Sequence, residues 1–273
     1  MPGTLLSFGH GYSAQALTRV IAPLGWKVVG TTRTQEKAER IAQTHATPVI
    51  WPGTDVRPLL EAADAVLISS GPGDKGDPVL AELADAIEAA ATKLHWCGYL
   101  STTGVYGDHQ GGWVDESSPL TPSTDRGRAR VKAEQAWQSI PGLPLHIFRL
   151  AGIYGPGRGP FAKVRAGTAR RIVKPGQVFS RIHVEDIAQT LAASLRQPNP
   201  GAIYNLCDDD PAPPEDVIAY AAELLGVPVP PAEPFETAHM TAMARSFYAE
   251  SKKVRNDRIK EELGIELLYP TYK

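Results

Sequence analysis

The sequence predicts an α/β protein with a doubly wound parallel sheet and a small C-terminal α/β lobe. Three observations favour this fold class. Short apolar runs typical of buried strands alternate with helical patterns through the first half of the chain. A glycine-rich turn joins the first apolar run to the first helical pattern. The 273 residues are 42% apolar and 21% charged, which is the composition of an ordinary globular protein.

Six apolar runs are expected to form strands, because each is short and is bounded by glycine, proline or polar residues. They lie at residues 4–8, 27–31, 48–51, 65–69, 96–100 and 145–150. Their regular separation leaves room for a helix after most of them. The strands should therefore run parallel, with helices on both faces of the sheet.

Helices are expected between these strands. Leu17, Ile21 and Leu24 share one face of the first helix, at residues 14–24, which Gly25 ends. The next helices are expected at residues 34–43, where Thr34 is the N-cap, at 77–94, which Asp77 and Pro78 open, and at 126–139. Residues 104–124 are rich in Gly, Ser, Thr, Asp and Pro and are expected to form a loop.

The turn between the first strand and the first helix fits the pattern G-x-G-x-x-A. Gly9 allows a tight turn, Gly11 lets a pyrophosphate approach the backbone, and Ala14 lets helix and strand pack closely. The helix N-terminus favours an anion. The motif predicts a Rossmann-type core that binds a dinucleotide around Gly9, Gly11, Tyr12, Ser13 and Ala14.

The composition and the pattern of predicted elements change near residue 155. Residues 1–155 are expected to form the NAD(P)-binding core. Prolines become frequent after this point, and short helices alternate with short strands. No long linker intervenes, so residues 156–273 are expected to form a smaller substrate lobe that completes the same structural unit. A cleft between core and lobe is the expected substrate site.

The end of the second strand bears on the choice of dinucleotide. Proteins that prefer NAD place an acidic residue about 20 residues beyond the glycines. Here Thr31, Thr32 and Arg33 follow instead. Hydroxyl and guanidinium donors suit a 2′-phosphate, so the sequence favours NADP over NAD. Alternatively, Arg33 is a solvated residue at the entry to the next helix.

Further motifs carry a family resemblance. Residues 101–107 read STTGVYG, 149–157 read RLAGIYGPG, 181–188 read RIHVEDIA, and the late strand at 204–209 reads YNLCDD. Together with the glycine turn, they resemble the extended and atypical branches of the short-chain dehydrogenase/reductase family, which include the NAD-dependent nucleotide-sugar epimerases and dehydratases. The resemblance implies an NAD(P)-dependent oxidoreductase with a small polar or anionic substrate, sugar-like or nucleotide-like.

The resemblance also implies roles for single residues. Thr102 matches the hydroxyl residue that lies beside the nicotinamide and hydrogen-bonds a substrate oxygen. Alternatively, it only satisfies a backbone group at the strand end. The other implied cofactor positions are Ser69, Ser70 and Gly71 beside the adenosine ribose, and Tyr154 and Gly155 on the loop that passes the nicotinamide.

The proton-transfer tyrosine of the family and its lysine partner are replaced. The family register, fixed by Glu134, places Arg126 at the tyrosine position and Arg130 at the lysine position. An arginine has a pKa above about 12 and stays protonated, so it cannot alternate as general acid and base. Arg130 would contact the nicotinamide ribose, and Arg126 would clamp an anionic substrate group. Alternatively, residues 126–130 are a basic, solvated helix turn.

Two functions therefore remain open. One is an epimerase/dehydratase-like enzyme with altered chemistry, and the other is a dinucleotide-binding sensor or regulatory protein without turnover. Tyr106, Tyr154 and His183 are the candidate replacements for the missing proton carrier. A packed aromatic role for Tyr106 and a structural role for His183 are the alternatives.

The remaining features set expectations about partners and location. The net charge of −2 gives no reason to expect a nucleic acid or membrane partner. Residues 1–20 lack the pattern of a signal peptide, and no apolar run approaches the roughly 20 residues of a membrane span. We expect a cytoplasmic protein with a small-molecule substrate, no metal site and two buried free thiols at Cys97 and Cys207. The resemblance adds a possible homodimer.

Overall fold

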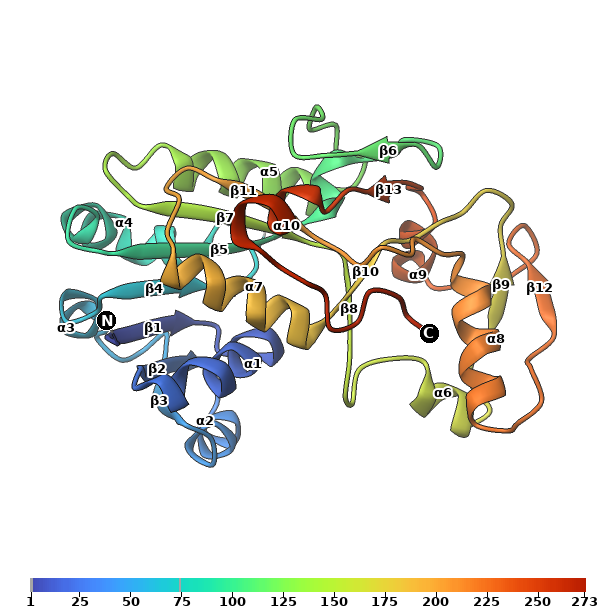
Figure 1. Ribbon diagram of the computed structural model, residues 1–273, viewed down its shortest axis with the longest axis horizontal. Coiled ribbons are helices and arrows are strands. Elements are labelled where there is room, and N and C mark those ends of the chain that lie inside the picture. The colour runs from blue at the N-terminus through green and yellow to red at the C-terminus, as the bar shows by residue number, and fades with distance from the viewer. Residues whose placement is uncertain (1, 74) are drawn as a thin grey trace.

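The computed structural model describes residues 2–73 and 75–273. Its central sheet has seven parallel strands in the order β11-β7-β5-β4-β1-β2-β3 (Figure 1). The strands are β1 (Thr4–Phe8), β2 (Lys27–Thr32), β3 (Ala46–Ile50), β4 (Ala65–Ile68), β5 (Trp96–Thr102), β7 (Leu145–Leu150) and β11 (Ile203–Leu206). The strand order reverses between β1 and β4, which creates a crevice at the carboxyl ends of these strands. The predicted doubly wound parallel sheet is confirmed.

Helices cover both faces of the sheet. The helices α1 (Tyr12–Ile21), α2 (Gln35–Ala42), α7 (Val184–Arg196) and α10 (Asp257–Leu263) bury apolar side chains in one core. The helices α3 (Arg57–Glu61), α4 (Pro78–Ala90) and α5 (Asp125–Gln138) do so in a second core. Neighbouring residues of β1 belong to different cores, Leu5 to the first and Leu6 to the second. This alternation is what a strand covered on both faces requires.

Some element boundaries differ from those predicted. Helix α1 begins two residues earlier than expected and continues into a 3-10 turn, η1 (Ala22–Leu24). Helix α4 ends at Ala90, although the apolar run continues to the buried Leu94. Helix α3 has five residues, too few to show a helical period in the sequence.

Residues 104–124 are more structured than a loop. They contain most of a 3-10 turn, η2 (Thr103–Tyr106), and a short strand, β6 (Trp113–Val114). Strand β6 pairs with β13 (Lys253–Val254), far along the chain. The sequence did not predict β6, because a two-residue strand has no alternating pattern of its own and its pairing partner is far along the chain.

The chain beyond residue 155 completes the sheet and also builds the lobe. Strand β11 pairs with β7, and α7 packs beside α1 (Figure 1). Strands β8 (Gly152–Tyr154) and β10 (Arg181–His183) pair beside the sheet. The lobe itself contains α6 (Phe161–Arg165), β9 (Arg171–Val173), α8 (Pro214–Leu224), β12 (Ala232–Pro234) and α9 (Ala242–Phe247). Among the described residues, no helix is long and apolar enough to cross a membrane.

Candidate functional site

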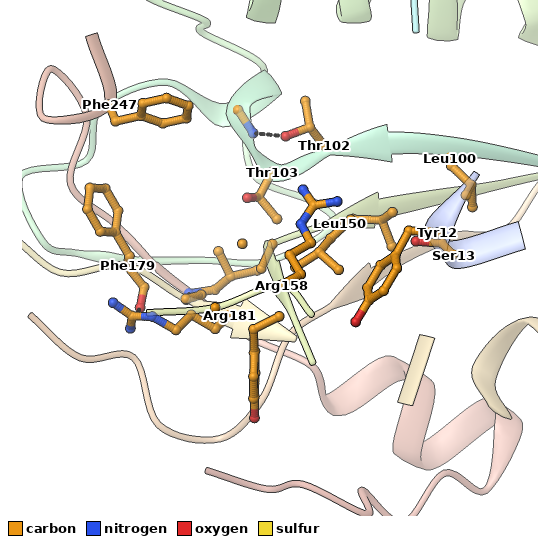
Figure 2. Close-up of a pocket in the computed structure, with 18 of the residues that line it drawn as sticks. Tyr12, Ser13, Leu100, Thr102, Thr103, Leu150, Arg158, Phe179, Arg181 and Phe247 are labelled. Carbon is orange, nitrogen blue, oxygen red and sulfur yellow. Dashed lines mark hydrogen bonds between the residues drawn. The ribbon is translucent and has the colours of Figure 1, made fainter. Parts of the chain in front are cut away.

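A cavity of about 1010 Å³ lies between the carboxyl edge of the sheet and the lobe. Thr102, Arg126 and Arg130 line it together with Gly9 and Gly11. The cavity therefore joins the predicted cofactor turn to the predicted catalytic positions. Figure 2 shows Tyr12 and Ser13 at one end of this cavity and Phe179 and Phe247 at the other.

The glycine turn has the geometry that a bound pyrophosphate needs. Gly9 has a φ of +74°, and a Cβ added there would lie 2.8 Å from the backbone nitrogen of Ser70. The backbone N–H of Gly9 donates to the hydroxyl of Thr31 at 3.0 Å, which fixes the turn. No side chain caps the N-terminus of α1 at Gly11. The first backbone N–H groups of α1 therefore fit a phosphate, and the residues present fit a dinucleotide.

The other predicted cofactor residues have different surroundings. Ser69 and Tyr154 line the cavity, whereas Ser70 and Gly71 are not among the residues that line it. Ser70 is packed against Gly9. A Cβ on Gly71 would lie 2.9 Å from Nη2 of Arg130, so the turn after β4 touches α5. The remaining three are the buried Ala14 in the core of α1, the buried Thr32 at the end of β2, and Gly155, whose φ is +146°.

Arg33 lies outside the lining of the cavity and is exposed. In the described part of the chain, its guanidinium makes no hydrogen bond or ion pair. The backbone carbonyl of Thr32 accepts from the N–H of Trp51 at 2.8 Å, which fixes the end of β2. Arg33 thus stands on a rigid strand end with its charge available to a ligand.

Arg130 is held in one position. Its Nη1 donates to the hydroxyl of Tyr99 at 3.1 Å and to the carbonyl of Leu100 at 2.7 Å. Its guanidinium also lies over the ring of Tyr99, 5.6 Å from the centroid. These contacts fix the guanidinium between the end of β5 and the turn after β4, on the wall of the cavity.

Arg126 lies one helical turn away and has other partners. Its Nη2 donates to the hydroxyl of Ser246 at 3.2 Å, and its guanidinium lies 4.9 Å from the ring centroid of Phe247. Both partners belong to α9 of the lobe. Arg126 lines the cavity but is exposed, so it bridges core and lobe at the solvent side.

Thr102 ends β5 and begins η2. Its hydroxyl oxygen accepts a hydrogen bond from the backbone N–H of Gly104 at 3.1 Å. The backbone role considered from the sequence is therefore present. This bond uses one lone pair, and the hydroxyl proton stays available to a ligand because the residue lines the cavity.

A buried polar network attaches α5 to the sheet. Glu134 and Arg149 form an ion pair at 2.8 Å, with 1% and 3% of their side chains exposed. Arg149 also donates to the hydroxyl of Tyr106 at 3.0 Å, which in turn donates to Asn205 at 2.7 Å. Ser101 donates to Glu134. The network was not predicted, although an arginine within the apolar run of β7 already requires a buried anion as its partner.

The three candidate proton carriers have structural partners. Tyr106 belongs to the buried network, and burial raises its pKa to about 12. The hydroxyl of Tyr154 donates to the carbonyl of Thr271 at 3.1 Å, and burial raises its pKa. Nδ1 of His183 accepts from the N–H of Glu185 at 3.3 Å, which caps α7, and burial lowers the pKa of this imidazole.

Sequence reasoning missed most of the charged residues that the lobe contributes. Arg158, Arg181 and Lys252 line the cavity together with the single acid Glu250. Lys252 is neutralised, because its ammonium donates to Glu250 at 2.8 Å. With Arg126 and Arg130 the lining carries five cations against one carboxylate, so it favours anions.

The described residues contain no group of three or more histidines, cysteines, aspartates or glutamates that could hold a metal ion. Cys97 and Cys207 are buried and unbridged. Burial raises the pKa of both thiols, which makes them poor nucleophiles.

Comparisons with known proteins agree with this geometry. The model of the NAD dependent epimerase/dehydratase family matches residues 8–207. Protein YeeZ of Escherichia coli (strain K12) is 31% identical over 277 residues, which cover 96% of this chain and 94% of that protein.

Two solved structures extend the comparison. A functionally unknown conserved protein from Silicibacter pomeroyi DSS has 63% identity and a TM-score of 0.95, covering 99% of this chain and 95% of that one. The human epimerase family protein SDR39U1, solved with NADPH, shares the fold at 20% identity and a TM-score of 0.76, covering 98% and 96%. With its glycine turn, sheet order and cavity, this chain belongs to the NAD-dependent epimerase/dehydratase family.

Proposed function

We propose that this protein is an NADP(H)-dependent oxidoreductase that acts on a small anionic molecule, with fixed arginine charges in place of a tyrosine–lysine pair. The observation that carries the proposal is the single cavity that joins the uncapped N-terminus of α1 to Thr102, Arg130 and Arg126. NADP(H) would supply the hydride acceptor or donor.

The predicted site residues then have distinct roles. The Gly9–Gly11 turn and the first turn of α1 hold the pyrophosphate through backbone N–H groups. Arg130, fixed by Tyr99 and Leu100, donates to the nicotinamide ribose. Thr102 donates its hydroxyl proton to a substrate oxygen, and Arg126 attracts the anionic group of the substrate from the solvent side.

The preference for NADP(H) rests on the end of β2. No acidic residue stands there, and the guanidinium of Arg33 has no partner within residues 2–73 and 75–273. A 2′-phosphate would accept charge-assisted hydrogen bonds from it. The human relative of the same fold was solved with NADPH.

A second function is favoured by the candidate proton carriers. Tyr106, Tyr154 and His183 all have structural hydrogen bonds, and the arginines stay protonated. A protein in which no side chain relays a proton could bind the dinucleotide and report its level without turnover.

One experiment tests the dinucleotide binding that both functions require. Calorimetry should show NADPH binding by the parent protein and none by Gly11→Val. Gly11 has a φ of −98°, and an added Cβ would meet only the carbonyl oxygen of Gly9 at 3.6 Å. The variant should therefore fold normally while its branched side chain fills the phosphate path.

The enzymatic claim is tested by hydride exchange. NADPH labelled with deuterium is incubated with the protein and a panel of sugar nucleotides and small anionic carbonyl compounds. Transfer of the label to any of them, absent in Gly11→Val, supports the oxidoreductase. Tight NADPH binding without transfer to any compound would favour the sensor.

A further inference from the structure

Arg181 stands where the main cavity meets a second one. The second cavity, of about 300 Å³, lies within the lobe. Four residues line both cavities, namely Gly159, Pro160, Arg181 and Val217. Arg181 alone among these four carries a charge. A ligand that extends from the main cavity into the lobe therefore passes this guanidinium.

The backbone holds Arg181 in place. Its Nη1 donates to the carbonyls of Phe179 at 2.8 Å and Ala212 at 3.0 Å, and these two residues are joined by a β-bridge. Its guanidinium lies over the ring of Tyr272, 5.8 Å from the centroid. Among the described residues, its Nε and Nη2 have no hydrogen-bond partner. Because these contacts fix the guanidinium and the residue lines the cavity, the remaining N–H groups are available to an acceptor there.

The charge of Arg181 is incompletely compensated. No carboxylate of the described residues forms an ion pair with it. Burial lowers the pKa of Arg181, and the nearby carboxyl of Asp208 opposes this shift. A partly buried cation that forms no ion pair gains from binding an anion. Lys163, on the wall of the second cavity, adds positive charge to the same region.

Aromatic rings surround this cation. Phe179, Tyr220 and Tyr272 line the main cavity, and Tyr248 lines the second. Tyr220 and Tyr272 meet edge to face with their centroids 5.8 Å apart, and Phe179 and Tyr248 do so at 5.9 Å. Figure 2 shows Arg181 beside Phe179, at the end of the cavity away from Tyr12. Such walls suit a flat apolar body.

We propose that Arg181 recognises the anionic group of the substrate, and that the substrate is a carboxylate or phosphate carried on a flat, mainly apolar ring system. The guanidinium holds two oxygens of the anion, and the ring system packs among Phe179, Tyr220 and Tyr272. This proposal rests on the proposed function only in placing the substrate beside NADP(H) in one cavity.

The probes are benzoate and phenyl phosphate, with benzyl alcohol as the uncharged ring and inorganic phosphate as the anion without a ring. Calorimetry is done on protein saturated with NADP⁺, so that the probes cannot occupy the cofactor turn. Benzoate or phenyl phosphate should bind about tenfold or more tightly than benzyl alcohol and than inorganic phosphate. The tighter of the two charged probes identifies carboxylate or phosphate as the natural group. Equal affinity for all four probes would overturn the proposal.

Variants then assign the effect to Arg181. Arg181→Met should weaken binding of the charged probe about tenfold or more while leaving benzyl alcohol unchanged. Arg181→Lys keeps the positive charge but loses the planar guanidinium, so it should weaken binding of the charged probe several-fold. Arg196→Met removes an equal charge at the exposed end of α7 and should have no effect. An equal loss in Arg158→Met, another arginine of the main cavity, would show that only the summed charge matters and would contradict the assignment.

NADPH affinity is measured in the same variants, so that failure of this proposal is distinguished from failure of the proposed function. Arg181→Met should bind NADPH as the parent does. If the parent binds no dinucleotide, the probe series on the cofactor-free protein still tests Arg181. A structure of the parent with phenyl phosphate decides the question even if the variants do not fold. Phosphate oxygens on Nε and Nη2 of Arg181 are expected, and a phosphate elsewhere would refute the proposal.

Discussion

At the scale of single residues, the most informative contrast is between Arg126 and Arg130. They occupy one face of α5, yet Arg130 is fixed by two hydrogen bonds to β5 whereas Arg126 reaches across to α9. Arg130 is therefore attached to the sheet, and Arg126 is attached to the lobe. A sequence register alone cannot distinguish these two roles, since both follow from tertiary contacts.

The choice of dinucleotide is tested at Arg33. Arg33→Ala should lower the affinity for NADPH by about 1.5–3 kcal/mol and leave NADH unchanged, because one charge-assisted contact to the 2′-phosphate is lost. Arg40→Ala is the matched control, since Arg40 is an exposed arginine of α2 whose ion pair is with Glu36. Calorimetry with both dinucleotides measures the ratio. An unchanged ratio in Arg33→Ala would rule out this basis for NADP preference.

His10 makes stability depend on pH. It is 4% exposed, neither ring nitrogen has a partner among the described residues, and its ring packs on Gly30. Burial lowers the pKa of His10 to about 4 from 6.5. The fold therefore favours the neutral imidazole, and stability is lost as the pH falls from about 6.5 towards 4.

His10→Leu removes this titration without removing a hydrogen bond. At pH 7.5 the variant should be within about 1 kcal/mol of the parent in free energy of unfolding. At pH 4.5 it should be more stable than the parent by about 2 kcal/mol, since only the parent must protonate the imidazole on unfolding. Urea unfolding at the two pH values measures the difference in free energy of unfolding between the variant and the parent. A difference that does not change with pH would contradict the buried, neutral His10.

At the scale of elements, the position of α5 depends on the buried pair of Glu134 and Arg149. Arg149→Met should lower the free energy of unfolding by about 3–5 kcal/mol, because it leaves the carboxylate of Glu134 buried without its partner. Arg149→Met combined with Glu134→Leu should be less destabilised than Arg149→Met alone, since no unpaired charge remains. Chemical denaturation measures both.

Arg128→Met is the control for this pair on the same helix. The ion pair of Arg128 with Asp125 is exposed, so its loss should cost less than about 1 kcal/mol. Comparable losses in Arg128→Met and Arg149→Met would show that burial is not what makes the inner pair important.

The sequence predicted elements whose signals are local. Strands β1 and β7 follow from apolar runs, and Thr34 and Asp77 are the N-caps of α2 and α4 that the sequence indicated. Strand β6 was missed, because its pairing partner is far along the chain. Within the site, the glycine turn was predictable, because the tight turn at Gly9 and the close approach of a phosphate at Gly11 both require a residue without a side chain. Arg181 was not, because only the packed lobe shows that its backbone hydrogen bonds use Nη1 and leave Nε and Nη2 without a partner among the described residues.

At the scale of the whole molecule, charge is distributed unevenly. The net charge is −2, yet the cavity lining has five cations and one carboxylate. The positive charge is therefore concentrated on the wall of the cavity. The double variant Arg126→Tyr with Arg130→Lys should weaken binding of phenyl phosphate or benzoate to the NADP⁺-loaded protein by a few-fold, because Arg126 is lost as an attracting charge. It should not by itself create activity, and an unchanged anion affinity would contradict the role of these arginines as fixed charges.

In the proposed complex, NADP(H) lies in one cavity between the turn of α1 and the two residues Thr102 and Arg130. A crystal structure of the protein with NADPH tests it most directly. We expect the pyrophosphate on the backbone N–H groups of the Gly9–Ser13 turn, the nicotinamide ribose on Arg130 and the 2′-phosphate on Arg33. A nicotinamide that lies away from Thr102 and Arg130, or a dinucleotide bound outside this cavity, would contradict the account.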